Sequence, residues 1–241
     1  MTYCVGLLLN EGMVLLSDTR TNAGLDNIAT YRKMFHFANK GERVISIVTA
    51  GSLSVTQTTI MRLREAIEAH DASEQTSIML APTMLKMASI IGETLAAVRL
   101  EIDEKLHAMK QGASASMIVA AQRRGGPMRL FLIYPEGNFI EATEDTPFLQ
   151  IGEHKYGKPI LDRVVTPQTS LQDAEKAVLL SMDSTLRSNL SVGMPLDLAI
   201  IEKDALCVSR ERRIEAGDEK FRAMSEAWSK ALRDGFTQIL I

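Results

Sequence analysis

Residues 2–20 read Thr-Tyr-Cys-Val-Gly-Leu-Leu-Leu-Asn-Glu-Gly-Met-Val-Leu-Leu-Ser-Asp-Thr-Arg, two apolar runs separated by a polar turn. Residues 3–9 are apolar at consecutive positions, as expected of a strand that is covered on both faces. Asn10-Glu11-Gly12 supplies a turn, and residues 13–17 return as a second strand. The stretch therefore predicts a buried hairpin that begins directly behind residue 2.

Thr2 stands in front of this hairpin, and its side chain is small enough for a methionine aminopeptidase to remove Met1. The new terminus would carry a nucleophilic hydroxyl and a free α-amine on adjacent carbons. Such an amine titrates near ~7.7–8.0, so it can accept the hydroxyl proton itself. A Met-Thr start also occurs in chains without this chemistry, so the neighbours of Thr2 decide whether it is a nucleophile.

Beyond the hairpin, groups of strand-like runs alternate with pairs of helix-like stretches. Strands are expected over residues 31–37, 43–50, 115–121, 128–134, 138–142, 196–201, 205–209 and 236–241. Helices are expected over residues 51–69, 84–109, 154–163, 171–188 and 218–233. No linker, repeat or low-complexity stretch interrupts this order. We therefore expect one α+β domain over residues 1–241, with sheets packed face to face and helix pairs outside them.

The composition excludes several classes of protein. The chain has 241 residues, of which 46% are hydrophobic and 24% charged, the balance of a globular protein. Its net charge of −3 and its 5% aromatic residues give no basic field and no stacking platform for nucleic acid. No signal segment opens the chain and no apolar run has the length of a membrane span. A cytoplasmic protein that binds neither nucleic acid nor membrane is expected.

Cysteine and histidine usage gives no sign of a metal site. Cys4 and Cys207 lie in apolar strand-like runs and are expected to be buried thiols in a reducing compartment. Four histidines are scattered without metal-ligand spacing: His36, His70, His107 and His154. Because a phosphate-binding glycine motif is also missing, we expect no metal and no cofactor. The mixed-charge run 210–213 favours a solvated face or a subunit contact.

Asp18 and Lys33 are the charged candidates beside Thr2. Asp18 ends the second hairpin strand, and a short hairpin returns that end to the start of the chain. Lys33 lies in the next strand-like run. An ammonium group held by a carboxylate beside the Thr2 hydroxyl would stabilise developing alkoxide charge and help to keep the α-amine neutral. Taken alone, an Asp and a Lys can equally form a surface ion pair.

Gly51 is the candidate oxyanion donor, because it joins a buried strand to a helix in Val48-Thr49-Ala50-Gly51-Ser52-Leu53. Backbone N–H groups at a helix start lack intrahelical partners, and they suit the oxyanion of a tetrahedral intermediate. A glycine at such a junction can also be an ordinary turn residue. Thr49 and Leu53 flank Gly51, and together with Arg20 they are candidates for contacting the substrate.

In this order and spacing, these residues resemble the N-terminal nucleophile hydrolases of the proteasome β-subunit type, over residues 2–202. The chain is most similar to the bacterial ancestral β-subunit family, Anbu, because threonine directly follows Met1 and an extra segment follows residue 205. The resemblance rests on motifs along the chain: Thr2, Ser17-Asp18-Thr19-Arg20, Lys33, Ala50-Gly51-Ser52, Gly125-Gly126-Pro127 with Leu130, Pro147-Phe148 with Ile151-Gly152, and residues 187–193.

The resemblance implies a four-layer αββα sandwich with Thr2 as nucleophile, Asp18 and Lys33 as its charged pair, and Gly51 as oxyanion donor. Ser191 matches a hydroxyl that family members place near the amine. Two positions depart from proteasome β-subunits, since Glu153 replaces a serine and Ser188 replaces an aspartate. Lys33 also lies one position closer to the threonine than in those subunits.

These features predict a self-assembling threonine amidohydrolase, with a peptidase acting through a Thr2 acyl-enzyme as the first expectation. A scaffold with a weak or vestigial site is the alternative that Glu153 and Ser188 motivate, and a small-amide hydrolase is a third. The family implies a homo-oligomer, either a closed ring or an open helical array. The helix over 218–233 is a candidate contact, although packing on its own subunit fits equally well. No residue indicates an ATP-driven partner.

Overall fold

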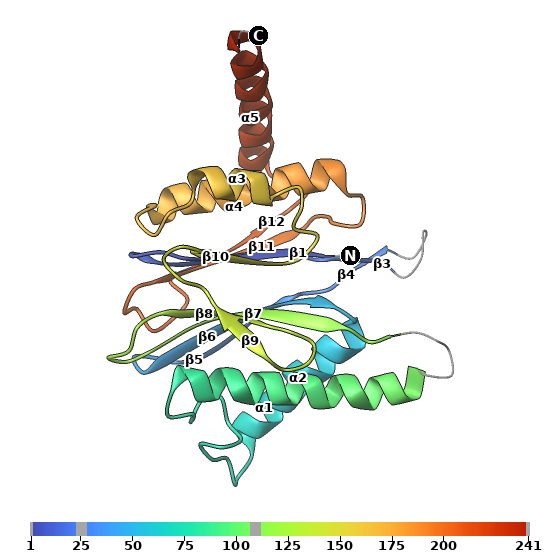
Figure 1. The fold of residues 1–241 in the computed structure, drawn as a ribbon, viewed down its shortest axis with the longest axis vertical. Coiled ribbons are helices and arrows are strands. Elements are labelled where there is room, and N and C mark those ends of the chain that lie inside the picture. Colours follow the sequence, from blue (N-terminus) through green and yellow to red (C-terminus); the bar gives the residue numbers. More distant parts are fainter. Residues whose placement is uncertain (1, 23–27, 107–111, 240–241) are drawn as a thin grey trace.

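The computed structural model describes residues 2–22, 28–106 and 112–239. Two five-stranded antiparallel sheets face each other, and a pair of helices covers the outer face of each (Figure 1). The larger strands are β1 (Tyr3–Leu8), β2 (Gly12–Asp18), β5 (Met34–Asn39), β6 (Arg43–Gly51), β7 (Ala115–Arg123), β8 (Arg129–Ile133), β10 (Phe148–Gly152), β11 (Leu196–Glu202) and β12 (Arg210–Ile214). The helices are α1 (Leu53–Glu68), α2 (Met84–Leu106), α3 (Lys158–Val164), α4 (Leu171–Ser188) and α5 (Glu219–Gln238). This is the predicted αββα sandwich.

The first sheet has the order β10-β1-β2-β11-β12, with the predicted hairpin β1–β2 at its centre. Every residue of β2 is buried, because this strand is covered on both faces. Met13 and Leu15 contact the core between the sheets, whereas Val14 and Leu16 contact the core beneath α3 and α4. The unbroken apolar run of the sequence follows from this double burial.

The second sheet has the order β5-β6-β7-β8-β9, with β9 spanning Phe139–Glu141. Its outer face and helices α1 and α2 enclose a separate apolar cluster. Helix α2 approaches the turn before β9 closely, since a Cβ on Gly92 would overlap the carbonyl of Gly137. The two sheets thus bring β1 and β2 opposite β6 and β7, and the candidate site lies at one end of β1, β2 and β6.

The C-terminal part of the chain differs from the sequence expectation in three ways. The expected strand over 236–241 is wrong, because α5 continues to Gln238, and residues 240–241 lie outside the described residues. The closing strand is not 205–209 but β12, which contains the mixed-charge run 210–213 and lies at the sheet edge. Cys207 therefore lies in the loop before β12 and is only partly buried, whereas Cys4 is buried as expected.

Smaller differences affect the sheet edges. The edge strand β10 and the two-stranded ribbon of β3 (Arg20–Asn22) and β4 (Ile28–Thr30) were not expected as strands. The strand expected over 31–37 begins only at Met34, and the short helix expected over 154–163 begins at Lys158. The C-terminal end of the helix expected over 84–109 lies outside the described residues beyond Leu106. Short edge strands carry few residues, so their apolar patterns are weak.

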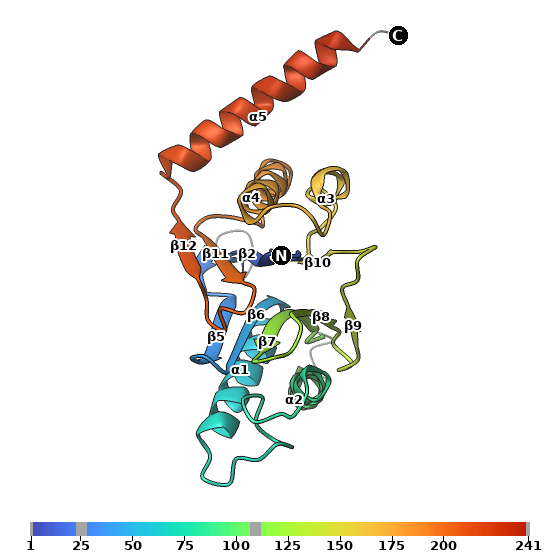
Figure 2. The ribbon, with the colours of Figure 1, turned by 90° about the vertical axis from the view of Figure 1, so that its left-hand side faces the viewer.

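Helix α5 leaves the sandwich and projects away from α4, so that only its first turns contact the rest of the chain (Figure 2). Phe221 and Met224 pack against the core beneath α4, and Ser225 accepts a hydrogen bond from Arg187 at 2.6 Å and donates one to Asp183 at 2.7 Å. Leu232, Phe236 and Ile239 follow on the same side and are 54%, 79% and 72% exposed. Among the described helices, none combines the length and apolarity that a membrane crossing requires.

Two helical glycines provide a test of the packing of α2. Gly92→Ala should lower the free energy of unfolding by about 1–3 kcal/mol, because the new methyl group overlaps Gly137 and forces the turn away. Gly235→Ala is the matched control in α5, where no atom lies near the added methyl group. There the same change should stabilise the helix by up to ~1 kcal/mol. Urea unfolding of both variants measures the difference, and equal effects would contradict the close packing of α2.

Candidate active site

The β1–β2 hairpin brings Thr2 and Asp18 together, as the sequence predicts. Cys4 pairs with Ser17 in the ladder, so the end of β2 lies beside the start of β1. Asp18 Oδ1 accepts a hydrogen bond from the Tyr3 N–H at 3.2 Å, directly behind Thr2. Thr2 is 7% exposed and Asp18 is fully buried. The nucleophile candidate and the carboxylate thus share one end of the first sheet.

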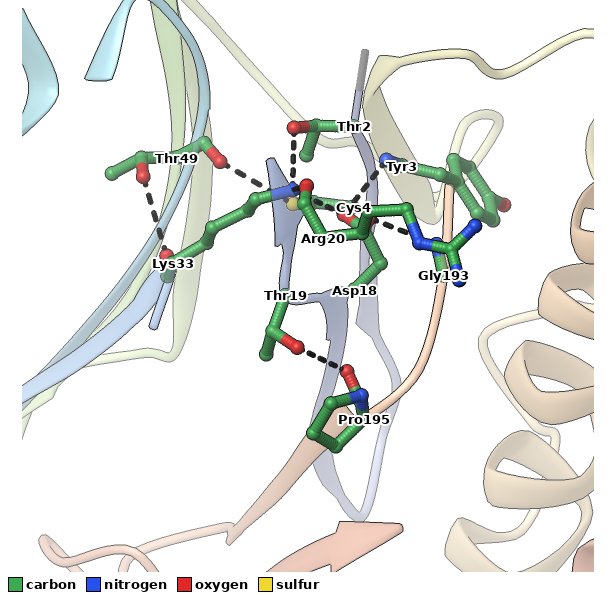
Figure 3. A network of polar contacts seen from close by, with 10 residues as sticks. All are labelled: Thr2, Tyr3, Cys4, Asp18, Thr19, Arg20, Lys33, Thr49, Gly193 and Pro195. Atoms are coloured by element: carbon green, nitrogen blue, oxygen red, sulfur yellow. Dashed lines mark hydrogen bonds and ion pairs between the residues drawn. The ribbon is translucent and has the colours of Figure 1, made fainter. Parts of the chain in front are cut away.

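Lys33 reaches the same point from the second sheet. It immediately precedes β5, and its carbonyl accepts a hydrogen bond from the Thr49 N–H at 2.9 Å. Its Nζ donates to Thr2 Oγ1 at 2.7 Å and to Asp18 Oδ1 at 2.7 Å (Figure 3). The third partner is the carbonyl oxygen of Arg20, at 2.6 Å. The predicted trio of Thr2, Asp18 and Lys33 is therefore brought together.

The three contacts of Lys33 decide what the ammonium group can do. A protonated lysine has three N–H donors and no acceptor, and here each donor has a partner. Lys33 is 5% exposed, so water does not replace these partners. In this state the ammonium group can stabilise negative charge on Thr2 Oγ1 but cannot accept the hydroxyl proton, which needs another base. The α-amine of Thr2, freed by removal of Met1, is the base that the sequence predicts.

Asp18 is held from three directions. Burial raises the pKa of its carboxyl group, whereas Lys33 and the N–H groups of Gly193 and Tyr3 act in the opposite direction. The Gly193 N–H donates to Oδ2 at 3.2 Å, on the side away from Lys33. Both carboxylate oxygens are thereby fixed, which orients the charge toward the lysine.

Arg20 contributes to the site through its backbone and through its side chain. Its guanidinium donates to the carbonyl of Leu190 at 2.8 Å and lies so close to Gly193 that a Cβ there would overlap it. The loop that carries Gly193 is thus fastened to the residue whose carbonyl accepts from Lys33. Thr19 adds a second link, since its hydroxyl donates to the Pro195 carbonyl at 2.6 Å.

Gly51 lies at the mouth of the site with a backbone φ of +109°, a conformation that favours glycine. A side chain there would overlap the carbonyl of Ser114, which accepts a hydrogen bond from the Ser52 N–H at 2.8 Å. The close approach of Ser114 therefore requires a glycine at position 51, whether or not a substrate also approaches it. Gly51 as the oxyanion donor stays a prediction.

A cavity of about 240 Å³ opens in front of Thr2. Arg20, Thr49 and Leu53, the three candidates for substrate contact, all line it, together with Lys33 and Gly51. The pattern of the sequence did not single out Thr21 and Thr56, which complete the polar part of the wall. Thr56 lies one helical turn after Leu53, so the helix periodicity could have identified it.

Of Ser191, Glu153 and Ser188, only Glu153 is hydrogen-bonded directly to Thr2 among the described residues. No hydrogen bond joins the described residues Ser191 and Thr2, so a role for this hydroxyl near the amine stays a prediction. The Glu153 N–H donates to the Thr2 carbonyl at 2.7 Å, and its carboxylate accepts from Asn189 Nδ2 at 3.1 Å. Ser188 is exposed at the end of α4. Glu153 thus holds the backbone of Thr2.

Sequence reasoning missed the backbone groups that complete the site. The N–H groups of Tyr3 and Gly193 and the carbonyl of Arg20 all bind the Asp18–Lys33 pair. Backbone groups leave no residue-type signal, although Gly193 closes one of the motifs that support the resemblance. In the described part of the chain, no three His, Cys, Asp or Glu side chains are grouped so that they could hold a metal ion.

Comparisons with known proteins identify related chains with the same fold. The family model described as "Proteasome subunit" matches residues 2–201. The solved structure of an Anbu (Gly-1) mutant from Hyphomicrobium sp. strain MC1 is 49% identical, with all of this chain and 99% of that chain covered and a TM-score of 0.93. The helical assembly of the Anbu complex from Pseudomonas aeruginosa is 44% identical, with coverage of 99% and 97% and a TM-score of 0.92. Proteasome subunit beta 2 of Pyrobaculum calidifontis is 24% identical over 211 residues, which are 88% of this chain and 92% of that protein.

The buried Asp18–Lys33 pair can be tested by removing one or both charges. Asp18→Asn should lower the free energy of unfolding by about 3–5 kcal/mol, because the Lys33 ammonium group then stays buried without a counter-charge. Asp18→Asn with Lys33→Met should recover part of that loss. Asp162→Asn in the exposed pair Lys158–Asp162 is the control, with an expected change below ~0.5 kcal/mol. A loss for Asp18→Asn as small as that of the control would show that the pair contributes little.

Proposed function

Because the chain belongs to the proteasome subunit family, and within it to the Anbu proteins, we propose that it is a threonine amidohydrolase with Thr2 as nucleophile. Removal of Met1 would create the free α-amine on which this chemistry depends. The observation that carries the proposal is the buried Lys33 ammonium group, 2.7 Å from both Thr2 Oγ1 and Asp18 Oδ1 at the wall of the cavity. The expected substrate is a peptide.

In the first step, Thr2 Oγ attacks the carbonyl carbon of an amide, and the hydroxyl proton passes to the α-amine. Lys33 lowers the energy of the alkoxide character that develops on Oγ, while Asp18 holds Lys33 in place. The tetrahedral intermediate then collapses. Its C–N bond breaks, the α-ammonium group protonates the leaving nitrogen, and an ester on Thr2 remains.

Water then hydrolyses this ester, with the α-amine again acting as the base and Thr2 Oγ as the leaving group. The α-amine removes a proton from water as the water oxygen bonds to the ester carbonyl carbon. The bond between that carbon and Thr2 Oγ then breaks, and the proton returns to Oγ. The Gly51 N–H is the proposed donor to the oxyanion in both steps. Ser191 is proposed to orient the amine, and Arg20, Thr49 and Leu53 to contact the substrate.

Two alternatives keep the fold and change the function. The cavity of about 240 Å³ is smaller than the ~300–1,000 Å³ of typical ligand pockets, which favours a small amide as a second substrate class. A scaffold with a vestigial site is the other alternative, favoured by Glu153. This residue replaces a serine and engages both the Thr2 backbone and Asn189. Turnover of a peptide library compared with small amides separates the two substrate classes.

We also propose that the chain assembles with copies of itself through the projecting half of α5. The apolar stripe that packs Phe221 and Met224 on the body continues as Leu232, Phe236 and Ile239, which are largely exposed. A partly apolar helix that stands away from its domain needs a partner to be stable in water. The helical assembly formed by the Pseudomonas aeruginosa Anbu complex supports another copy of this chain as that partner.

The nucleophile is tested by mass spectrometry of the intact protein after incubation with a β-lactone. Loss of Met1 and one covalent adduct are expected for the parent protein, and no adduct for Thr2→Ala, which lacks the attacking oxygen. Lys33→Ala should slow adduct formation roughly 100-fold or more, because the charge beside the oxygen is lost.

Thr56→Ala is the matched control for this experiment, since Thr56 lines the cavity but its hydroxyl donates to the Leu53 carbonyl and not to Thr2 or Lys33. It should keep the adduct. An adduct on Thr2→Ala would refute Thr2 as the nucleophile. A protein that retains Met1, or forms no adduct while its assembly is intact, would favour the scaffold.

The assembly is tested by sedimentation velocity. Leu232→Ser with Phe236→Ser should shift the protein to smaller species, because the exposed part of the stripe is lost. Lys230→Ser with Asp234→Ser removes an exposed ion pair from the opposite side of the same helix and should leave the size unchanged. Equal effects of the two double variants would show that helix stability, and not the apolar face, controls the assembly.

A further inference from the structure

Three arginines gather at the end of the second sheet that lies farthest from Thr2. Arg43 and Arg123 are paired across β6 and β7, and Arg124 follows in the next turn. These three residues and Glu42 are the whole lining of a pocket of about 280 Å³. Gly51 of the Thr2 site is eight residues further along β6, a distance of about 26 Å in an extended strand. The arginine pocket is therefore separate from the Thr2 cavity.

Arg43 places a buried positive charge beneath this pocket. It is 7% exposed, and its two terminal nitrogens donate at 2.6 Å to the carbonyls of Ile78 and Ala81. Its Nε is buried without a hydrogen-bond partner. Burial lowers the pKa of Arg43, Glu42 opposes this shift, and the charge of Arg123 adds to it. The neutral carbonyls satisfy the terminal donors of Arg43 but do not neutralise its charge, and Glu42 supplies one carboxylate against the three guanidinium groups of the pocket.

Arg123 and Arg124 are the exposed donors of the pocket. Nε of Arg124 donates to the Gly41 carbonyl at 2.5 Å, and the side chain of Arg123 lies over Gly126. Within the described residues, no salt bridge joins any of the three guanidinium groups to a carboxylate. Like charges directly opposite each other on paired strands are destabilising. The fold thus maintains a repulsive Arg43–Arg123 pair that an anion would turn into an attractive arrangement.

We propose that this pocket binds a phosphate group. Three guanidinium charges and one Glu42 carboxylate leave a net charge of +2 on the lining residues. A phosphate group carries about −1.5 to −2 at neutral pH, and its oxygens match the fork of arginine donors. Arg123 and Arg124 would donate to these oxygens, and Arg43 would act through its charge from below. Free phosphate and the phosphate of a larger metabolite share this chemistry.

Isothermal titration with inorganic phosphate at constant ionic strength tests the site in the full chain. We expect one saturable site per chain with a dissociation constant on the order of 1 mM. Arg123→Gln and Arg124→Gln should each weaken binding about tenfold or more, because each removes a charge-assisted donor. Arg163→Gln, an exposed arginine of α3, is the matched control and should bind as the parent does. Thr2→Ala should also bind normally, whatever the outcome for catalysis.

Thermal unfolding separates binding from a structural role of Arg123. Without phosphate, Arg123→Gln should melt at or above the temperature of the parent, because the repulsion with Arg43 is relieved. Phosphate should raise the melting temperature of the parent more than that of the variant, whose weaker binding gives a smaller stabilisation. Unchanged binding in Arg123→Gln, or no saturable binding to the parent, would overturn the proposal. Acetate that binds as tightly as phosphate would overturn the assignment to phosphate, whereas a hexose phosphate that competes would extend the site to larger ligands.

Discussion

The ammonium group of Lys33 is the contact on which the arrangement of this site depends. Lys33 immediately precedes β5 of the second sheet, whereas Thr2 and Asp18 lie at one end of the first sheet. Arg20, the third partner, follows Asp18 by two residues. A charge taken out of water needs all of its donors satisfied, and only this approach of the two sheets provides three acceptors. The core between the sheets is apolar around Cys4, Val48 and their neighbours. The apolar packing therefore sets the distance between the two sheets, and the Lys33 contacts fix how the sheets are positioned relative to each other at this end.

The sequence predicts those parts of the site whose positions follow from neighbouring residues in the chain. The turn at Asn10-Glu11-Gly12 closes a hairpin, so the end of β2 has to return to Thr2, and Asp18 is placed by that alone. Lys33 was harder to place, because its position depends on the second sheet lying over the first. The Gly193 N–H, 175 residues from Asp18, could not be derived, because backbone donors have no signature and the loop is fixed by tertiary contacts.

The errors of prediction concentrate at the C-terminal end of the chain. Phe236 to Ile241 is a short apolar run, and such a run has no period that separates a strand from the last turns of a helix. Helix α5 begins at the Asp218 cap, whose side chain accepts from the Phe221 N–H at 2.8 Å, and no proline interrupts it before Gln238. Strand β12 was not predicted because its sequence is rich in arginine and has no apolar pattern. In the structure, Arg213 of β12 forms an ion pair at 3.0 Å with Asp197 on the neighbouring strand β11.

The burial of Thr2 also has a consequence for the order of events during biosynthesis. Its carbonyl is bound by Glu153, which is made only after some 150 further residues, and its hydroxyl by Lys33. At translation rates of about 5–20 residues per second, the chain start waits about 8–30 seconds for that partner. An aminopeptidase works on a free, extended chain end, and the Thr2 backbone lacks its Glu153 partner throughout this interval. If Met1 is removed as proposed, the rate at which ribosomes deliver Glu153 sets how long the chain start can be trimmed before this contact forms.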